Sequence, residues 1–136
     1  MYKSKTQIRV RYAETDQMGY VYYGNYATYY EVARVESLRQ LGLSYKNLEA
    51  DGIIMPVLEN YSKYIAPGRY DELLTVKTVI KKRPGVKIVF NYEIFNEADE
   101  LINTGETKLA FIDTASGKPC RMPDDLAEAM AGYFAL

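Results

Sequence analysis

Histidine is absent from the chain, and Cys120 is its only cysteine. A Ser-His-Asp or Cys-His site therefore cannot be built from this chain alone, nor can the usual histidine or thiolate zinc sites. A single cysteine also excludes a disulfide within the chain, and we interpret Cys120 as a buried or incidental thiol. The chemistry that remains must rest on carboxylates, hydroxyls, backbone amides or an oxygen-ligated metal.

A strong excess of one charge is missing as well. The 17 Lys and Arg residues nearly balance the 18 Asp and Glu residues, which removes the broad basic field expected of a nucleic-acid-binding protein. No apolar run approaches the roughly 20 residues of a membrane helix, and the N-terminal residues lead into no apolar signal core. We therefore expect a cytoplasmic protein that binds neither nucleic acid nor membranes. The acidic residues show no calcium-loop spacing, so no metal is predicted.

Apolar residues make up 48% of the chain, which is enough for one core at this length. Residues 1–136 are therefore predicted to form a single domain. Apolar side chains alternate at Ile8, Val10 and Tyr12, which indicates a first strand.

A long helix is predicted over residues 26–41. Asn25 is a suitable N-cap, and Gly42 stands where a C-terminal cap belongs. The apolar residues of this segment occupy more than one helical face, so we expect the helix to be largely enclosed.

Four strands and a short helix are predicted after the long helix, from alternating residues and turn signals. The strands cover residues 55–64, 73–81, 86–94 and 101–113, and the helix covers residues 123–133. Short turns join the last three strands, so these should form an antiparallel meander. The order of elements predicts an α+β fold in which one sheet wraps around the long helix.

The most informative segment lies directly before the long helix. It places the carboxylate of Asp16 in a loop that contains Gly19 and Gly24. Free backbone N–H groups at a helix N-terminus can hold an oxygen that carries negative charge. From the residues alone, Asp16 could also be a loop cap in an Asx turn. The two glycines could serve the turn or let the backbone approach a ligand.

Glu31, inside the predicted helix, could be a second carboxylate near this site. The favoured alternative is an ion pair with Arg34 or with Arg39. Glu36 and Arg39 are expected to form a pair of the same kind.

Five short motifs accompany this order of elements. They are RYAETD at residues 11–16, GYVYYGNY at 19–26, YEVARVE at 30–36, SKYIAPGRYD at 62–71 and GKP at 117–119. Together they resemble the hotdog-fold acyl-CoA thioesterases of the 4-hydroxybenzoyl-CoA thioesterase type, over nearly the whole chain. The resemblance implies a hotdog fold, with a five-stranded antiparallel sheet around the central helix. It also implies hydrolysis of an acyl-CoA thioester to free acid and thiol.

In that family the aspartate of the first loop is the catalytic carboxylate, and its place in the motif falls on Asp16. The backbone N–H at the start of the central helix polarises the thioester carbonyl, and that position falls on Tyr23. Many relatives carry histidine there, so in this chain the resemblance carries over only the backbone donor. Asp16 could attack directly to give a mixed anhydride, or act as a general base toward water.

The resemblance also suggests where substrate binds. Lys82, Arg83 and Lys87 flank the turn where relatives bind nucleotide phosphates, with a solvated turn as the alternative. Pro56 and Val57 fall where the family lines its acyl and pantetheine channel, with ordinary strand packing as the alternative. No cofactor is expected beyond coenzyme A as part of the substrate.

The family further implies a homodimer whose sheets join edge to edge, often paired into tetramers, with sites between subunits. One rival is an acyl-carrier-protein thioesterase, because an acidic carrier would also suit the cationic turn around Lys82. Another rival is a non-catalytic acyl-thioester-binding module, because fold does not determine function. The tyrosines at residues 20–30 allow an aromatic acyl group, and the apolar strands allow a medium-length chain.

Overall fold

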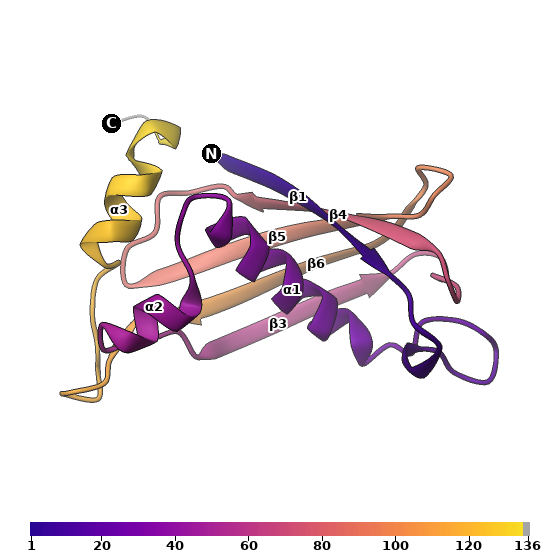
Figure 1. The fold of residues 1–136 in the computed structure, drawn as a ribbon, viewed down its shortest axis with the longest axis horizontal. Coiled ribbons are helices and arrows are strands. Elements are labelled where there is room, and N and C mark those ends of the chain that lie inside the picture. Colours follow the sequence, from indigo (N-terminus) through magenta and orange to yellow (C-terminus); the bar gives the residue numbers. More distant parts are fainter. Residues whose placement is uncertain (135–136) are drawn as a thin grey trace.

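The computed structural model describes residues 1–134 and contains a five-stranded sheet with a long helix across one of its faces (Figure 1). Neighbouring strands run antiparallel, in the order β1-β4-β5-β6-β3. In that order they span Tyr2–Arg9, Leu73–Ile80, Lys87–Phe95, Leu101–Ala110 and Val57–Tyr64. The helix α1 spans Asn25–Arg39. This arrangement confirms the predicted α+β class, a sheet wrapped around one helix.

Smaller elements complete the described part of the chain. A short helix, α2, and a three-stranded sheet of β2, β7 and β8 were not predicted, because segments this short carry little periodicity. They span Tyr45–Ala50, Ile53–Ile54, Ile112–Asp113 and Lys118–Pro119. The predicted closing helix over residues 123–133 is present as α3 (Asp124–Met130) followed by a 3₁₀ turn, η2 (Ala131–Tyr133). None of the described helices is long and apolar enough to cross a membrane.

The predicted meander of β4, β5 and β6 is confirmed, but one of its strands is shorter than expected. The strand predicted over residues 101–113 leaves the main ladder after Ala110, and Ile112–Asp113 joins the small sheet instead. At the break, the N–H of Phe111 donates to the carbonyl of Val86 at 3.1 Å. The strand predicted over residues 55–64 begins at Val57, after a proline that has no N–H to donate.

The start of the chain differs from the prediction at two residues. Tyr12 is not part of β1, which ends at Arg9; it opens a 3₁₀ turn, η1 (Tyr12–Glu14), and is exposed. Asn25 is not the N-cap of α1, because Gly24 occupies that position and Asn25 is the first helical residue. Both differences arise because the chain turns at these residues, and the alternation of apolar residues in the sequence does not reveal a turn.

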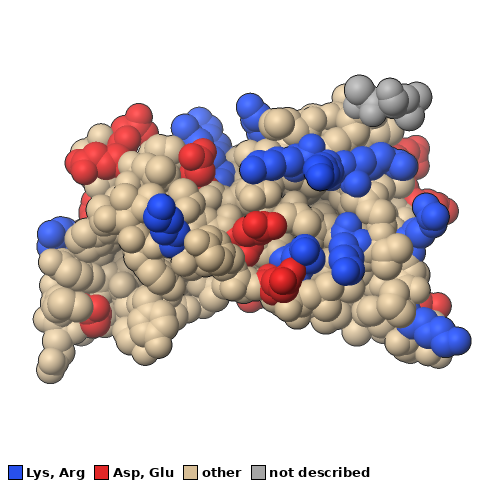
Figure 2. All heavy atoms as spheres, turned by 180° about the vertical axis from the view of Figure 1, so that it is seen from behind, with Lys and Arg blue, Asp and Glu red and all other residues tan. Residues whose placement is uncertain are grey.

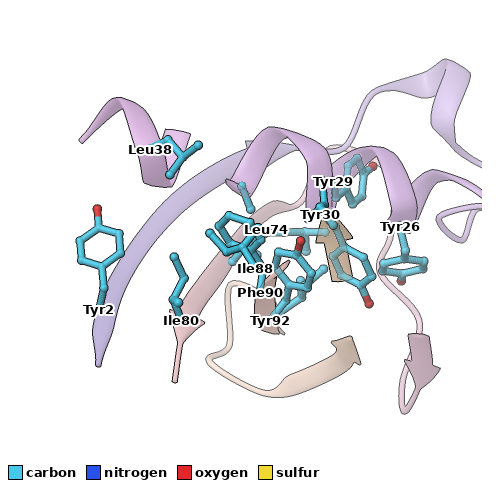
Figure 3. Close-up of a cluster of buried hydrophobic side chains, with 14 of the residues drawn as sticks. Tyr2, Tyr26, Tyr29, Tyr30, Leu38, Leu74, Ile80, Ile88, Phe90 and Tyr92 are labelled. Atoms are coloured by element: carbon cyan, nitrogen blue, oxygen red, sulfur yellow. The ribbon is translucent and has the colours of Figure 1, made fainter. Parts of the chain in front are cut away.

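The helix α1 is buried on one face only, which corrects the expectation that it is largely enclosed. Tyr26, Tyr29 and Tyr30 project from it toward the sheet and are at most 3% exposed (Figure 3). Val32 lies outside this buried stripe and is 39% exposed. The helix ends at Arg39, two residues before the predicted end, and its C-cap is Gln40 rather than the predicted Gly42. Gly42 follows with a φ of +83°, which suits a residue without a side chain.

One of the predicted ion pairs on α1 forms and the other does not. Glu36 pairs with Arg39, as predicted. Glu31 is exposed and makes no ion pair within residues 1–134, so its predicted pairing is wrong. Arg34 instead turns into the core, beside the hydroxyls of Tyr45 and Tyr92. Burial raises the pKa of both tyrosines, and the guanidinium opposes that rise.

Tyr30 connects α1 to the edge strand β3. Its ring stacks on Tyr92 with 4.2 Å between centroids, and its hydroxyl bonds to Ser62, at 2.8 Å, and to Asn103. The ring lies so close to Gly105 that a Cβ there would come within 2.2 Å of the phenol oxygen. These contacts satisfy a buried hydroxyl, which would otherwise be costly to bury, and they define the position of β3 under the helix.

Candidate active site

The Asp16 loop, residues 15–24 between η1 and α1, is hydrogen-bonded to the segment of residues 68–70. The N–H of Val21 donates to the carbonyl of Gly68 at 2.8 Å, and the N–H of Tyr70 donates to the carbonyl of Gly19 at 3.2 Å. Backbone hydrogen bonds of this kind hold a loop in one conformation without a strand ladder. Asp16 therefore has a defined place even though it lies outside the sheet.

Asp16 forms an Asx turn with one of its two carboxylate oxygens. Its Oδ1 accepts the N–H of Met18 at 2.9 Å and the N–H of Tyr20 at 3.2 Å. Gly19 lies inside this turn with a φ of +76°, a backbone conformation that favours glycine. In the described part of the chain Oδ2 has no hydrogen-bond partner, so the turn leaves one oxygen of a half-buried carboxylate open.

Tyr23 and Gly24 lie immediately before the first residue of α1. The N–H of Tyr22 donates to the carbonyl of Glu14, and the N–H of Asn25 donates to the carbonyl of Tyr22, at 2.8 and 2.9 Å. Among residues 1–134 the N–H of Tyr23 has no acceptor, so it is a free donor at the positive end of the helix. Gly24 has an ordinary φ of −64°, but a Cβ there would lie 3.1 Å from the ring of Tyr22.

Aromatic rings surround this helix start. The rings of Tyr22 and Tyr23 lie 4.7 Å apart, and Tyr64 packs against Tyr23 at 6.4 Å and against Tyr26 at 5.5 Å. Tyr64 is the last residue of β3. The exposed edge of the sheet therefore reaches the loop that holds Asp16.

Glu14 is part of this site, although the sequence did not single it out. Its carboxylate accepts hydrogen bonds from Arg11 and from the hydroxyl of Tyr29, and it is 7% exposed. Burial alone would raise the pKa of Glu14, but the hydrogen bonds from Arg11 and Tyr29 lower it below its ordinary value. Burial and the bond to Glu14 raise the pKa of Tyr29. The i, i+3 spacing of Arg11 and Glu14 was the available signal.

The predicted phosphate-binding residues lie far from Asp16 within one chain. Because Tyr2 pairs with Ile80, the turn after β4 lies at the end of β1 opposite to the Asp16 loop (Figure 1). A groove of about 440 Å³ there is lined by one acidic side chain, Glu106, and by the cationic side chains of Lys81, Lys82, Arg83, Lys87 and Lys108, the last of which pairs with Glu59. Figure 2 shows Lys and Arg side chains gathered over one half of the molecule as seen from behind.

Pro56 and Val57 are also remote from Asp16 in one chain. Val57 pairs with Leu109, whereas Tyr64, beside the Asp16 loop, pairs with Asn103 at the other end of the same ladder. Asp16, Gly19, Tyr23 and Gly24 thus lie in one loop between η1 and α1, and the remaining predicted site residues lie at the other end of the sheet. Within residues 1–134 no group of three or more acidic or cysteine side chains could hold a metal ion.

Comparison with known proteins identifies the family. The model of the thioesterase-like superfamily matches residues 10–130. The chain is 40% identical to YneP of Bacillus subtilis (strain 168), provisionally named an acyl-CoA thioesterase, over 88% of this chain and 86% of the relative. It is 34% identical to the acyl-CoA thioester hydrolase YbgC of Escherichia coli O6:H1, over 88% and 89%. The crystal structure of DHNA-CoA thioesterase from Staphylococcus aureus superposes with a TM-score of 0.91 at 43% identity, covering 98% of this chain and 91% of that one.

The chain therefore belongs to the thioesterase-like superfamily. The predicted hotdog fold and the predicted enzyme class, a thioester hydrolase, are both confirmed.

Proposed function

We propose that the chain hydrolyses an acyl-CoA thioester to a free acid and coenzyme A. Asp16 is the reacting carboxylate, and the backbone N–H of Tyr23 polarises the thioester carbonyl. The observation that carries the proposal is one loop with an open carboxylate oxygen and a free helix N-terminal N–H. The names of the two relatives above, which share 40% and 34% identity, support coenzyme A as the carrier.

Two routes are compatible with this arrangement. Asp16 can attack the carbonyl carbon and expel the thiolate, leaving a mixed anhydride that water hydrolyses, or it can deprotonate the attacking water. In both routes negative charge develops on the thioester oxygen, where the N–H of Tyr23 would stabilise it. A preorganised donor of this kind is worth ~3 to 4 kcal/mol, or a few hundred-fold in rate. Neither route needs a histidine.

We propose that the active unit is a homodimer joined through β3. Seven of the eight residues of this edge strand are exposed, including Val57, Leu58, Tyr61 and Tyr64. An exposed apolar edge with free backbone groups favours pairing with another strand. A second copy of the chain supplies a matching edge, because a two-fold axis makes the same surface self-complementary.

Antiparallel pairing of the two β3 strands would complete the site. If the strands pair along their full length, the partner's Val57 lies beside Tyr64 and close to the Asp16 loop. The partner's Pro56 and its cationic turn then come to the same end of the joined sheet. The predicted channel and phosphate-binding residues, remote within one chain, would thus serve the site of the other. Two such dimers could pair into a tetramer.

Release of thiol from a panel of short, long and aromatic acyl-CoAs tests the activity. Asp16→Asn should lower kcat/KM by at least about a hundredfold, because the amide is neither a good nucleophile nor a base. A matched control is Asp113→Asn, since Asp113 also forms an Asx turn, with its Oδ1 accepting the N–H of Ala115 at 3.0 Å. The control should stay within about twofold of the wild type. Near-normal turnover by Asp16→Asn would contradict the assignment of Asp16 as the reacting carboxylate.

An acyl-carrier-protein thioester is a second candidate substrate, favoured by the cationic groove around Lys82. An acidic carrier would be attracted to this surface at low salt. Hydrolysis of matched acyl-CoA and acyl-carrier substrates separates the two carriers. Binding of both without release of thiol would point instead to a non-catalytic acyl-thioester-binding module.

A further inference from the structure

We propose that Glu14 is a positioning residue, which holds the Asp16 loop and the N-terminus of α1 in one fixed relation. This inference rests on the function proposed above, because it assigns Glu14 a role toward Asp16 and Tyr23. The residue does not touch the reacting atoms. It acts through the segments on either side of the loop.

The carboxylate of Glu14 joins the chain before the loop to the helix after it. Its Oε1 accepts the N–H of Arg11 at 2.8 Å and the hydroxyl of Tyr29 at 3.0 Å. Its Oε2 accepts the Nε and Nη2 of Arg11 at 3.2 and 2.9 Å. Four hydrogen bonds thus converge on one buried carboxylate, from residues that stand before Asp16 and inside α1.

The backbone carbonyl of Glu14 makes a second connection. It accepts the N–H of Tyr22 and the side-chain Nδ2 of Asn25, both at 2.8 Å. Tyr22 directly precedes the free N–H of Tyr23, and Asn25 is the first residue of α1. One residue therefore bonds both to the segment before the loop and to the start of the helix.

Only an ionised carboxylate fits these donors. A carboxylate accepts hydrogen bonds at both oxygens, whereas an amide would direct its own N–H₂ toward Arg11 or Tyr29. Bonds to a charged acceptor are also roughly twice as strong as neutral ones. Both oxygens of Glu14 are occupied, in contrast to Asp16, which keeps one oxygen open. This difference assigns positioning to Glu14 and reaction to Asp16.

Turnover with separate kcat and KM values provides the test. Glu14→Gln should lower kcat by at least about tenfold with little change in KM, because a misplacement near 1 Å can cost about a hundredfold. Tyr29→Phe removes a single hydroxyl and should lower kcat by about threefold or more. The matched control is Tyr2→Phe, because Tyr2 is equally buried and donates to the carbonyl of Ser37 at 2.6 Å, far along α1. It should keep kcat within about twofold at a similar loss of melting temperature.

Amide hydrogen exchange reports on the loop without relying on turnover. In Tyr29→Phe the amides of Met18, Tyr20 and Tyr22 should exchange at least about tenfold faster, because they depend on the loop that Glu14 holds. The amides of β5 should keep their protection. If Glu14→Gln does not fold, Asn25→Ala and Tyr29→Phe still remove single contacts of Glu14.

The possible outcomes separate the two proposals. If Glu14→Gln and Tyr29→Phe keep normal kcat while Asp16→Asn is inactive, the positioning role is wrong and the proposed function stands. If Tyr2→Phe loses turnover in the same proportion as Tyr29→Phe, Glu14 serves stability alone and the inference is overturned. If Asp16→Asn stays active, the proposed function fails. Unchanged exchange at Met18, Tyr20 and Tyr22 then overturns the positioning role as well.

Discussion

The two edges of the five-stranded sheet, β1 and β3, present different chemistry to their surroundings. Along β1 the exposed side chains alternate with half-buried ones and are charged or polar: Lys3, Lys5, Gln7 and Arg9. Charged side chains, lysine above all, discourage pairing with another strand. The backbone of β1 is also partly covered, because Gln40 donates to the carbonyl of Lys5 at 3.2 Å. We call this polar and partly covered edge the closed edge.

The edge at β3 is open. Its exposed residues include Leu58, Tyr61 and Tyr64, and only two of its eight residues are charged. It is attached to α1 by the polar contacts of Tyr30 and by the packing of the Tyr64 ring on the helix. This difference bears on the candidate site, because Tyr64 at the end of the open edge contacts Tyr23. The candidate site therefore lies at the open edge. The proposed chemistry and the proposed association are thus located at the same edge.

A charge placed on the open edge should have the largest effect. Tyr61→Lys brings two lysines close together across the proposed two-fold axis and removes an aromatic anchor, worth ~2 kcal/mol or more. Since symmetry counts this loss twice, we expect a rise of about 10³-fold in the dimer dissociation constant, measured by analytical ultracentrifugation. Turnover per chain should fall with the dimer population.

The matched control for Tyr61→Lys is Gln7→Lys, which adds the same charge to the closed edge. It should leave both association and turnover unchanged. If Tyr61→Lys remains a dimer with full activity, β3 is not the dimer contact. The proposed difference between the two edges would then be wrong.

A methyl group at Gly105 should weaken the attachment of the open edge. The Cβ of Gly105→Ala would come within 2.2 Å of the phenol oxygen of Tyr30, and overpacking of this kind costs ~1 to 3 kcal/mol. We expect that loss in the free energy of unfolding, measured by denaturant titration. Gly85→Ala is the control, because nothing lies within 4 Å of its Cβ position. If Gly105→Ala has the same free energy of unfolding as the wild type, Tyr30 does not anchor β3.

A smaller effect should appear in how the free energy of unfolding depends on pH. Glu14, beside the loop, should contribute to this dependence, whereas Tyr2, on the closed edge, should not. The pKa of Glu14 is lowered in the folded chain, despite burial, by the hydrogen bonds from Arg11 and Tyr29. Its contribution to stability is therefore complete above the unfolded pKa of about 4.3, and it is lost as the pH falls through the lower folded pKa.

The measurement is the difference in unfolding free energy between the wild type and Glu14→Gln as a function of pH. We expect this difference to be constant from neutral pH down to about 5 and to shrink below about 4. The corresponding difference for Tyr2→Phe, a residue of β1 that carries no carboxyl, should not change over this range. Parallel curves for the two variants would contradict the role of the Glu14 charge.

Periodicity located some strands better than others for a physical reason. In β4 the buried Leu74, Val76 and Ile80 alternate with exposed or half-buried residues, so the predicted and observed bounds differ by one residue. In β3 nearly every residue is exposed, and only the surrounding turn signals revealed a strand. A strand that is buried on neither face within one chain leaves no alternation to detect.

In the candidate site, too, the sequence revealed local features and missed those that depend on distant contacts. The position of Asp16 before a helix is local in the chain and was visible in the sequence, whereas its catalytic role and the backbone donor at Tyr23 came from the family resemblance. The sequence missed Glu14, whose partner Tyr29 is 15 residues away. Pro56 and Val57 were assigned to the site from the resemblance, but only the ladder to β6 showed that they lie a strand length from Asp16.

By itself, the sequence determined which chemistry was available. A chain without histidine is left with carboxylates, hydroxyls, backbone amides or an oxygen-ligated metal. A loop carboxylate before a helix can be recognised from residue type and short spacing. The tertiary structure alone decided which carboxylate is enclosed by donors, Glu14, and which keeps an open oxygen, Asp16. It alone decided that one sheet edge is closed and the other open. Which donors reach a carboxylate, and which sheet edge is covered, depend on contacts between residues distant in the chain, and local spacing does not encode those contacts.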